Sequence, residues 1–521
     1  AQTERYETCD PERLGFVDTG TIVAVEVGTE EVEAKVWRLA VGRVDLYVLD
    51  TDLPTNSRTG RTITDRLYSG DREHRIRQEL ILGVGGLRAL RAIGQDPAVV
   101  HLNEGHAGFL LLERLQDHLA TGSSWQQAIE KTRAGAVFTT HTPVPAGIDR
   151  FERDLVEPYV APWAEANGVE LDTLFELATS ADDAGKPKPF NMAVLCLNLT
   201  GAANGVSKLH GQVSRELFGS VPAGPTIGSV TNGVHARTWV APEMADVFDQ
   251  TLGEGWDVGD PVAWDRVRQL DDTTVKAALS SGRRRLIDLI GSADIDTTNL
   301  DPNALTIGFA RRFATYKRAD LLLGEPDRLA RLLADDSRPV QFVFAGKAHP
   351  ADDDGKAVLE RVVAFAHSAE ANGRFIFLPD YEMAIARAMY AGCDIWLNNP
   401  IRPHEASGTS GEKAALNGGL QLSILDGWWD EMYDGDNGWA VTSSASDDPS
   451  TRDKEEAASI YELLEGEVQP LFYSGTGRPT GPWLEKVRHN WITLGPRVTA
   501  ARMVADYRDQ VYTPALQRSR R

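Results

Sequence analysis

The chain has 521 residues, with 54 lysines and arginines against 76 aspartates and glutamates, so its formal net charge is −22. At roughly 100–200 residues per domain this length predicts two or three domains, and 42% hydrophobic with 25% charged residues is typical of a globular protein. The negative charge argues against nucleic acid and membrane surfaces as partners, so an anionic ligand needs a local basic cluster. No apolar run approaches the ~18 residues of a membrane helix, and we expect a cytoplasmic protein.

Cysteine and histidine spacing gives little support for a metal or disulfide framework. The three cysteines, Cys9, Cys196 and Cys393, are far apart and form no CxxC pair. This excludes a disulfide scaffold and a zinc ribbon. His101 and His106 lie five residues apart, a spacing that does not place both on one helical face, and we expect no metal site.

The first part of the chain combines a predicted meander with a predicted helix. In residues 21–53 short apolar runs alternate with glycine and acidic turns, which indicates antiparallel strands. From Asp65 the apolar residues take helical spacing, and Gly94 is the expected end of this helix.

Strands and helices then alternate to the end of the chain. In the first series we expect strands at residues 99–102, 137–141 and 226–233, and a helix over 191–210. In the second series, predicted strands begin at Leu305, Val340, Arg374, Asp394 and Leu420. Continuous apolar strands alternating with helices predict an α/β protein with two doubly wound parallel sheets.

Basic residues follow several strands of the second series. Arg311, Arg312 and Lys317 come after its first strand, Lys347 after its second, and Lys413 after its fourth. Ligands of open parallel sheets bind beyond the carboxyl ends of the strands. The pattern therefore predicts an anion site sized for more than one phosphate, with pairing to nearby carboxylates as the alternative.

Lys413 lies in the segment EASGTSGEK, whose small residues precede a predicted helix. The free N–H groups at a helix start favour phosphate, and we place Lys413 in the first turn. Crowding by arginines would favour the neutral amine, which suits covalent attachment of pyridoxal phosphate. The alternative is an ordinary solvated lysine.

These segments carry a resemblance to a known family. HLNEGHAGF, FTTHTPVPAGIDRF, SVTNGVHARTW, FARRFATYKR, FLPDYEMAIARAMYAGCDIWLNNP and EASGTSGEKAALNGGLQLSILDGWWDE resemble, in this order, the glycogen and α-glucan phosphorylases, in particular their shorter bacterial branch. The resemblance runs from about Gly15 nearly to the C-terminus. It implies a GT-B fold, in which two Rossmann-like domains enclose a cleft. It also implies reversible phosphorolysis of terminal α-1,4-linked glucose to glucose 1-phosphate with retention of configuration.

The resemblance also implies roles for single residues. Lys413 matches the lysine that forms the Schiff base with pyridoxal 5'-phosphate, the expected cofactor. Residues matching those around this cofactor are Arg311, Thr409, Ser410, Tyr381 and Trp239. Arg312 and Lys317 match residues that bind substrate phosphate. Residues matching those that bind the glucosyl hydroxyls are His141, Asn232, Glu405, Ser407 and Gly408. The expected catalytic residues are Lys413, Arg312, Lys317 and His141.

The same resemblance predicts the domains and partners. Residues 1–235 would be the remainder of an N-terminal glucan domain, 236–495 the cofactor-binding domain, and 496–521 a helix packing back onto the first domain. The family's glycine-rich loop is absent from this sequence, so we expect a fragment with an incomplete N-terminal domain. The expected partners are glycogen, starch or maltodextrin, orthophosphate and, at full length, a second copy in a homodimer.

Some residues depart from the family pattern. Ser410 replaces the glycine of the animal enzymes, Glu412 stands where an apolar residue is usual, and Ala314 and Thr315 replace His-Glu. A glycogen synthase-like glucosyltransferase that uses a nucleotide sugar, and an inactive glucan-binding homologue, remain the alternative functions.

Overall fold

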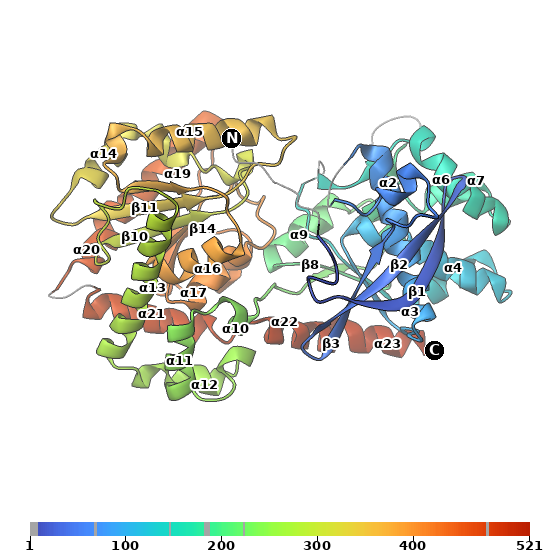
Figure 1. Ribbon diagram of the computed structural model, residues 1–521, viewed down its shortest axis with the longest axis horizontal. Helices are drawn as coiled ribbons and strands as arrows, with labels where there is room; N and C mark the ends of the chain where they lie inside the picture. Colours follow the sequence, from blue (N-terminus) through green and yellow to red (C-terminus); the bar gives the residue numbers. More distant parts are fainter. Residues whose placement is uncertain are drawn as a thin grey trace. The chain divides into compact units, whose positions relative to one another are not determined.

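A computed structural model describes residues 9–66, 70–144, 147–181, 188–221, 224–475 and 479–520. The described chain forms two compact units (Figure 1). The N-terminal unit holds residues 9–206, 211–229 and 507–520, and the C-terminal unit holds 207–210 and 230–506. Within the described residues, every helix is too short or too polar to cross a membrane.

The N-terminal unit begins with the expected meander. Strands β1 (Val17–Val27), β2 (Glu30–Val41) and β3 (Val44–Asp50) pair antiparallel in that order. Short helix α1 (Arg58–Arg61) follows, and then α2 (Arg72–Leu80) continues through a π-helical turn (Ile81–Gly85) into α3 (Gly86–Ala92). The predicted helix therefore exists and ends before Gly94, whose φ of 82° suits a glycine. Residues 67–69 of the predicted segment lie outside the described residues.

A parallel sheet forms the rest of this unit. Its strand order is β4 (Val100–Asn103), β5 (Ala136–Thr139), β8 (Ala202–Gly205) and β9 (Ile227–Ser229). The strands β6 (Arg150–Phe151) and β7 (Phe190–Asn191) form a separate antiparallel pair. The helices of this part are α4 (Leu110–Ala120), α5 (Trp125–Ala134), α6 (Arg153–Ala166), α7 (Leu171–Glu176) and α8 (Met192–Leu199).

The prediction of a single helix over residues 191–210 is wrong. The chain there forms α8, then β8, and then enters α9 (Lys208–Leu217). The β8 residues are small and lack β-branching, so the strand carries no local signal of its own. Its register beside β5 is fixed by backbone pairing of Val137 with Ala202 and of Thr139 with Asn204.

The C-terminal unit is built on six parallel strands in the order β12 (Phe375–Leu378), β11 (Val340–Ala345), β10 (Leu305–Ala310), β13 (Ile395–Asn398), β14 (Leu420–Ile424) and β15 (Gly438–Val441). The five strands predicted from Leu305 onward are all present, and β15 is an additional one. Every residue of β10 and β11 is buried, as expected for strands covered on both faces. The chain order reverses between β10 and β13.

Helices lie on both faces of this sheet (Figure 1). The helices of this unit up to residue 494 are α10 (Ala236–Trp239), α11 (Pro242–Thr251), α12 (Pro261–Asp265), α13 (Asp272–Ser292), α14 (Pro326–Ala334), α15 (Asp353–Ala366), α16 (Met383–Gly392), α17 (Thr409–Leu416), α18 (Trp428–Met432), α19 (Pro449–Leu463), α20 (Gln469–Phe472) and α21 (Gly481–Leu494). The last helices, α22 (Ala500–Tyr507) and α23 (Thr513–Ser519), are joined by a π-helical turn, and the chain passes from one unit to the other at residue 507.

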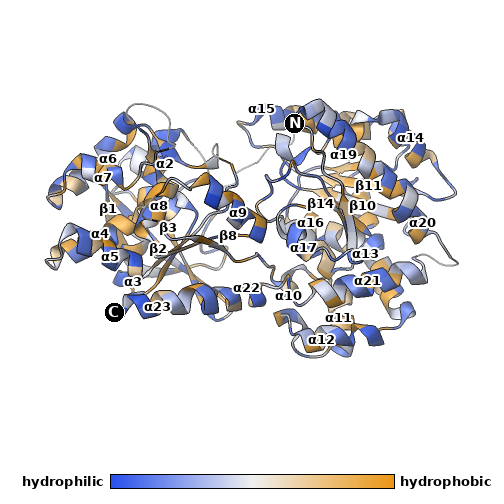
Figure 2. Cartoon of the chain, turned by 180° about the vertical axis from the view of Figure 1, so that it is seen from behind, coloured by the Kyte–Doolittle hydropathy of each residue, from blue (hydrophilic) through white to orange (hydrophobic). Residues whose placement is uncertain are grey.

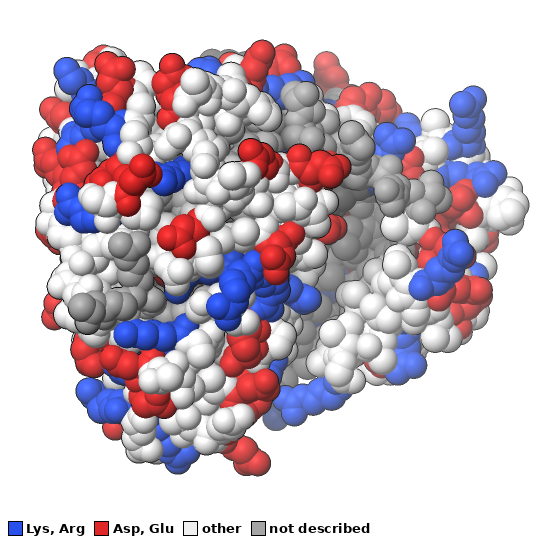
Figure 3. Space-filling model, turned by 60° about the vertical axis from the view of Figure 1, so that its left-hand side comes forward, with Lys and Arg blue, Asp and Glu red and all other residues white. Residues whose placement is uncertain are grey.

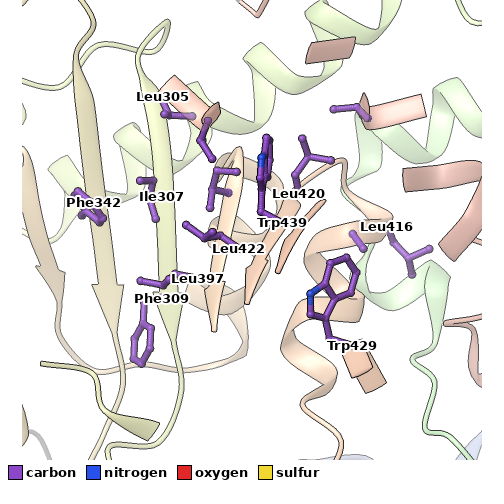
Figure 4. Close-up of a cluster of buried hydrophobic side chains, with 14 of the residues drawn as sticks. Leu305, Ile307, Phe309, Phe342, Leu397, Leu416, Leu420, Leu422, Trp429 and Trp439 are labelled. Atoms are coloured by element: carbon purple, nitrogen blue, oxygen red, sulfur yellow. The ribbon is translucent and has the colours of Figure 1, made fainter. Parts of the chain in front are cut away.

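The core of the C-terminal unit follows from the alternation along its strands. Leu305, Ile307 and Phe309 of β10 join a large cluster that includes Trp429 and Trp439 (Figure 4). Ala310 belongs to a second cluster, on the side of Trp396. The strands are apolar and the outer helix faces hydrophilic (Figure 2), while acidic and basic side chains intermingle on the surface (Figure 3).

Candidate functional site

The candidate site lies in the C-terminal unit, where the loops after β10 and β13 begin on either side of the reversal in strand order. Loops diverge from such a point and leave a crevice at the carboxyl edge of the sheet. The loop after β10 carries Arg311, Arg312 and Lys317, and the loop after β13 carries Glu405. The topology therefore brings together residues almost 100 positions apart.

A buried ion pair joins these two loops. Nη2 of Arg311 donates to Oε2 of Glu405, and Nζ of Lys317 lies 3.8 Å from the same oxygen. Arg311 and Glu405 are 7% and 8% exposed. Burial alone would raise the pKa of Glu405, but Arg311 and Lys317 outweigh it and the pKa is lowered. The cluster therefore contains one carboxylate against two cations.

The cations of this cluster have spare capacity for an anion. Within the described chain, Nη1 of Arg311 is buried without a hydrogen-bond partner. Burial, together with the neighbouring charge of Arg311, lowers the pKa of Lys317 to about 8, against the opposing effect of Glu405. Arg312 is exposed beside them. An incoming anion would satisfy the orphaned guanidinium nitrogen and stabilise the lysine ammonium.

Asp426 fixes the backbone of Glu405. It follows β14, and its carboxylate accepts the N–H groups of Glu405 at 2.9 Å and of Gly427 at 2.8 Å. Burial raises the pKa of Asp426 to about 7. This residue was missed in the sequence, although its position at a strand end is the same signal that identified Arg311.

Ser407 and Gly408 lead into helix α17. Ser407 is buried, and among the described residues its Oγ has no hydrogen-bond partner. Gly408 is the N-cap of α17, with a φ of 88° that a side chain would strain. The helix therefore starts sharply, and the N–H groups of its first turn at Thr409 and Ser410 are available to a ligand.

Lys413 is the fifth residue of α17, one position beyond the expected first turn. Its Nζ lies 4.1 Å from the ring centroid of Trp239 and 5.7 Å from that of Tyr390. Burial lowers the pKa of Lys413, whereas Glu412 opposes this effect. The sequence-based explanation was therefore wrong in its cause, because the arginines crowd Lys317 rather than Lys413.

An aromatic wall extends behind Lys413. The ring of Tyr390 lies 5.7 Å from Trp239 and 4.8 Å from Trp396, between centroids. Tyr381 packs against the same hydrophobic cluster, and burial raises its pKa. The predicted cofactor residues Trp239 and Tyr381 are thus grouped with Lys413 by packing.

Glu412 directly precedes Lys413 in α17. It is fully buried, and neither carboxyl oxygen has a hydrogen-bond partner among the described residues. Burial raises its pKa well above the usual range, although Arg502 and Lys413 oppose this. Burial therefore favours the neutral form of this carboxyl group. Nothing in the structure explains why a carboxyl stands at this position.

Asn232 also belongs to the C-terminal unit. Its carbonyl oxygen accepts from Nη2 of Arg502 at 2.8 Å, and the Thr231 carbonyl accepts from Nη1 at 2.8 Å. Arg502 thus holds the segment that leads into α10 and Trp239. The side chain of Asn232 is half-buried.

His141 lies in the N-terminal unit, directly beyond β5. Its backbone N–H donates to Oε2 of Glu104 at 2.6 Å, and its Nε2 lies 2.5 Å from Oδ1 of Asn103. Burial lowers the pKa of His141, so the imidazole is neutral at pH 7. Glu104 itself has a φ of 73°, an unusual conformation at the end of β4.

A second polar group in the N-terminal unit was not predicted. Oδ2 of Asp149 lies 3.0 Å from Nδ1 of His106, and Oε1 of Glu79 lies 3.7 Å from it. Arg75 contacts both carboxylates, at 3.2 Å to Glu79 and 3.3 Å to Asp149. His101 does not belong to this group, because its ring nitrogens hydrogen-bond with the hydroxyl groups of Thr139 and Tyr512. We call Arg75, Glu79, His106 and Asp149 the arginine–histidine network.

The protonation states in this network follow from burial and contact. Burial raises the pKa of Glu79 to about 8. Hydrogen bonds to Asp149 and Glu79 overcome burial and raise the pKa of His106 to about 9, while the pKa of Asp149 falls to about 2. The i, i+4 spacing of Arg75 and Glu79 was the only local signal for this group.

Comparison with known proteins identifies close relatives. The carbohydrate phosphorylase family model matches residues 88–434. The glycogen phosphorylase of Mycobacterium tuberculosis (strain ATCC 25618 / H37Rv) is 46% identical over 100% of this chain, which spans 64% of that relative. The maltodextrin phosphorylase of Thermococcus litoralis is 39% identical over 99% of the chain and 63% of the relative. The glycogen phosphorylase of Aquifex aeolicus is 36% identical over 95% of the chain and 74% of the relative.

Proposed function

Because the chain belongs to the carbohydrate phosphorylase family, we propose that it takes part in the phosphorolysis of α-1,4-glucans, releasing terminal glucose as glucose 1-phosphate with retention of configuration. The expected α/β fold with parallel sheets, of the GT-B type, is confirmed. The chain spans less than two thirds of the first two relatives, so the activity is proposed for the protein of which these residues form part.

The observation that carries this proposal is the pairing of Arg311 and Lys317 around Glu405, at the edge of the sheet where α17 begins. An excess of buried positive charge beside a helix start is suited to phosphate groups. In a chain of net charge −22, such a local excess supports a specific anion site.

The residues around Lys413 fit pyridoxal phosphate. Its amine has a lowered pKa and an aromatic wall, while buried Nη1 of Arg311 has no partner within the described residues. Lys413 would hold the cofactor through its amine, Trp239 and Tyr381 would line the pocket, and Arg311, Thr409 and Ser410 would bind the phosphate. When bound, pyridoxal phosphate supplies in this family a phosphate group able to exchange a proton with the substrate phosphate.

The remaining residues would bind and orient the substrates. Lys317 and Arg312 would hold orthophosphate. They would thereby keep its negative charge beside the positive charge that develops on the glucosyl group along the reaction path. Glu405 would accept hydrogen bonds from glucosyl hydroxyls, with Ser407 and the backbone of Gly408 beside it. Its lowered pKa keeps it an acceptor at neutral pH. Asn232 would contribute an amide to the same sugar.

His141 is proposed to bind the glucosyl group as well. A neutral imidazole can donate from one nitrogen and accept at the other, which suits a hydroxyl. Glycogen, starch or maltodextrin would be the glucan, and we further propose a cytoplasmic homodimer.

The test is chemical labelling of the chain. The protein is incubated with pyridoxal phosphate and reduced with borohydride, and labelled peptides are identified by mass spectrometry. Label is expected at Lys413. Lys413→Arg is expected to remove it, while Lys356→Arg, a paired surface lysine on α15, serves as the matched control and keeps it.

Two other results would contradict the proposal. If the label is spread over surface lysines and does not change in Lys413→Arg, the assignment of Lys413 as the pyridoxal phosphate lysine is wrong. Glucosyl transfer from a nucleotide sugar, without release of glucose 1-phosphate in orthophosphate, would instead favour the synthase-like alternative.

A further inference from the structure

Ser410 is the second residue of α17. A glycine at this position would have no side chain, whereas serine adds a hydroxyl. Its Oγ accepts a hydrogen bond of 3.2 Å from Nε1 of Trp396. A serine hydroxyl has one proton to donate, and this contact uses an oxygen lone pair rather than that proton. Among the described residues no further partner is recorded for this hydroxyl, so its proton remains available.

The indole of Trp396 is held in one position. Trp396 lies on β13 and is 1% exposed, with its ring 4.8 Å from that of Tyr390. Its neighbour in register on β10 is Gly308. A Cβ on Gly308 would lie 2.9 Å from Cζ3 of Trp396 and 2.6 Å from Sγ of Cys393, so only glycine leaves room for the ring.

We propose that Trp396 is a positioning residue that orients the Ser410 hydroxyl, so that Ser410 donates a hydrogen bond to the phosphate of the bound cofactor. This inference rests on the proposed function, because the anion is the phosphate of pyridoxal phosphate. Trp396 acts only through Ser410 and does not itself touch the ligand. The serine thereby adds a side-chain donor to the N–H groups of the α17 first turn.

The physical reason for this arrangement is preorganisation. A free serine hydroxyl rotates among three staggered positions and loses that freedom when it binds an anion. A rigid indole N–H that occupies the lone-pair side biases the hydroxyl proton away from Trp396. Part of the ordering is then in place before the ligand arrives.

The test is a double-mutant cycle read by ligand affinity. The dissociation constants for pyridoxal phosphate and for pyridoxal, which lacks the phosphate, are measured by absorbance titration for wild type, Trp396→Phe, Ser410→Ala and the double variant. Each single variant is expected to weaken pyridoxal phosphate about 3- to 10-fold, as for one hydrogen bond. The double variant should be no weaker than Ser410→Ala, and pyridoxal affinity should not change in any variant.

Trp264→Phe is the matched control. Trp264 is another buried tryptophan of the same unit, and its Nε1 donates to the backbone carbonyl of Trp256 at 2.9 Å. Loss of this hydrogen bond in Trp264→Phe should leave the affinities for pyridoxal phosphate and for pyridoxal unchanged. Ser410→Ala removes only one oxygen, so it tests the hydroxyl even if Trp396→Phe folds poorly.

Each remaining outcome overturns a distinct statement. Equal losses for pyridoxal and pyridoxal phosphate, or additive losses in the double variant, would show that Trp396 has only a packing role and would overturn the inference. Unchanged pyridoxal phosphate affinity in Ser410→Ala would do the same. If the wild-type protein does not bind pyridoxal phosphate at Lys413, the proposed function is overturned, and this inference with it.

Discussion

Each of the two units contains a cluster of charged side chains, and the two clusters differ in their balance of acidic and basic groups. In the C-terminal unit, Arg311 and Lys317 face one carboxylate, Glu405. In the N-terminal unit, Arg75 and His106 face two, Glu79 and Asp149. The first cluster therefore has one carboxyl group for two cations, whereas the second has one carboxyl group for each cation.

The pKa values express this difference. The pKa of Lys317 falls to about 8 because burial and Arg311 disfavour its charge. The pKa of His106 rises to about 9 because carboxylates stabilise its charge despite burial. A cation with a lowered pKa gains from an added anion, whereas one with a raised pKa already has its partner. The comparison supports the proposed anion site at the C-terminal cluster.

The largest expected effect comes from removing the buried arginine. Arg311→Met leaves Glu405 buried with only Lys317 at 3.8 Å, and breaking a buried pair in this way costs about 3 kcal/mol of unfolding free energy. Arg312→Met is the matched control, because the neighbouring arginine is exposed and should cost no more than about 0.5 kcal/mol. Urea unfolding of both variants measures the difference. Equal losses would mean that the Arg311–Glu405 pair is no more important than a surface contact.

The second prediction concerns pH in the N-terminal unit. Glu79 and His106 both have pKa values raised on folding, to about 8 and about 9. Between their unfolded and folded pKa values the folded protein binds more protons, so stability falls as pH rises. Wild type is expected to lose about 2 kcal/mol between pH 7 and 8, at roughly 1.4 kcal/mol per proton and pH unit. Asp149, whose pKa is lowered, adds dependence only in acid.

Glu79→Gln should reduce this pH dependence by about half, because the amide does not titrate whereas His106 still does. Glu73→Gln is the control on the same helix: hydrogen bonds from Tyr159 and Arg77 lower the pKa of Glu73, so it does not titrate above pH 6. The measurement is urea unfolding at pH 6, 7, 8 and 9. A slope unchanged in Glu79→Gln would exclude Glu79 as its source.

Much of this architecture was predictable from local patterns. The strands from Leu305 to Leu420 are continuous apolar runs, and their carboxyl ends identified Arg311, Lys317 and Lys413. The sequence pattern did not predict β8 and instead favoured one helix there, because the small residues of β8 take their conformation from pairing with β5. The cause of the Lys413 pKa was wrong because distance along the chain does not reveal which amine the arginines approach.

The arginine–histidine network shows the same limit. Its members come from α2, from the loop after β4 and from the segment before β6. Only tertiary packing joins Arg75 with Asp149, 74 residues away. No periodicity encodes such a contact, whereas an ordered series of strand ends does encode which loops share an edge of the sheet.

The third prediction tests the anion site through Lys317. Its ammonium is lost above a pKa of about 8, so sulfate affinity should fall about tenfold from pH 7 to 9. Sulfate is chosen because it does not titrate in this range. Lys317→Arg should keep the affinity nearly constant with pH, because the guanidinium stays charged. Lys356→Arg should retain the wild-type decline, and calorimetric titration measures all three. Parallel declines in Lys317→Arg and wild type would place the titrating group elsewhere.

The smallest expected effect separates burial from cation–π attraction at Lys413. Trp239 both shields the amine from water, which lowers its pKa, and presents a ring face at 4.1 Å, which favours the ammonium. Trp239→Phe keeps an apolar ring but weakens the attraction, so the pKa of Lys413 should fall slightly further. Trp239→Ala admits water, and because burial is the larger effect the pKa should rise. The pH dependence of Lys413 acetylation, followed by peptide mass spectrometry, measures both, with Lys356 as the internal reference. A fall in both variants would reverse this ranking and make the ring face the dominant influence on the amine.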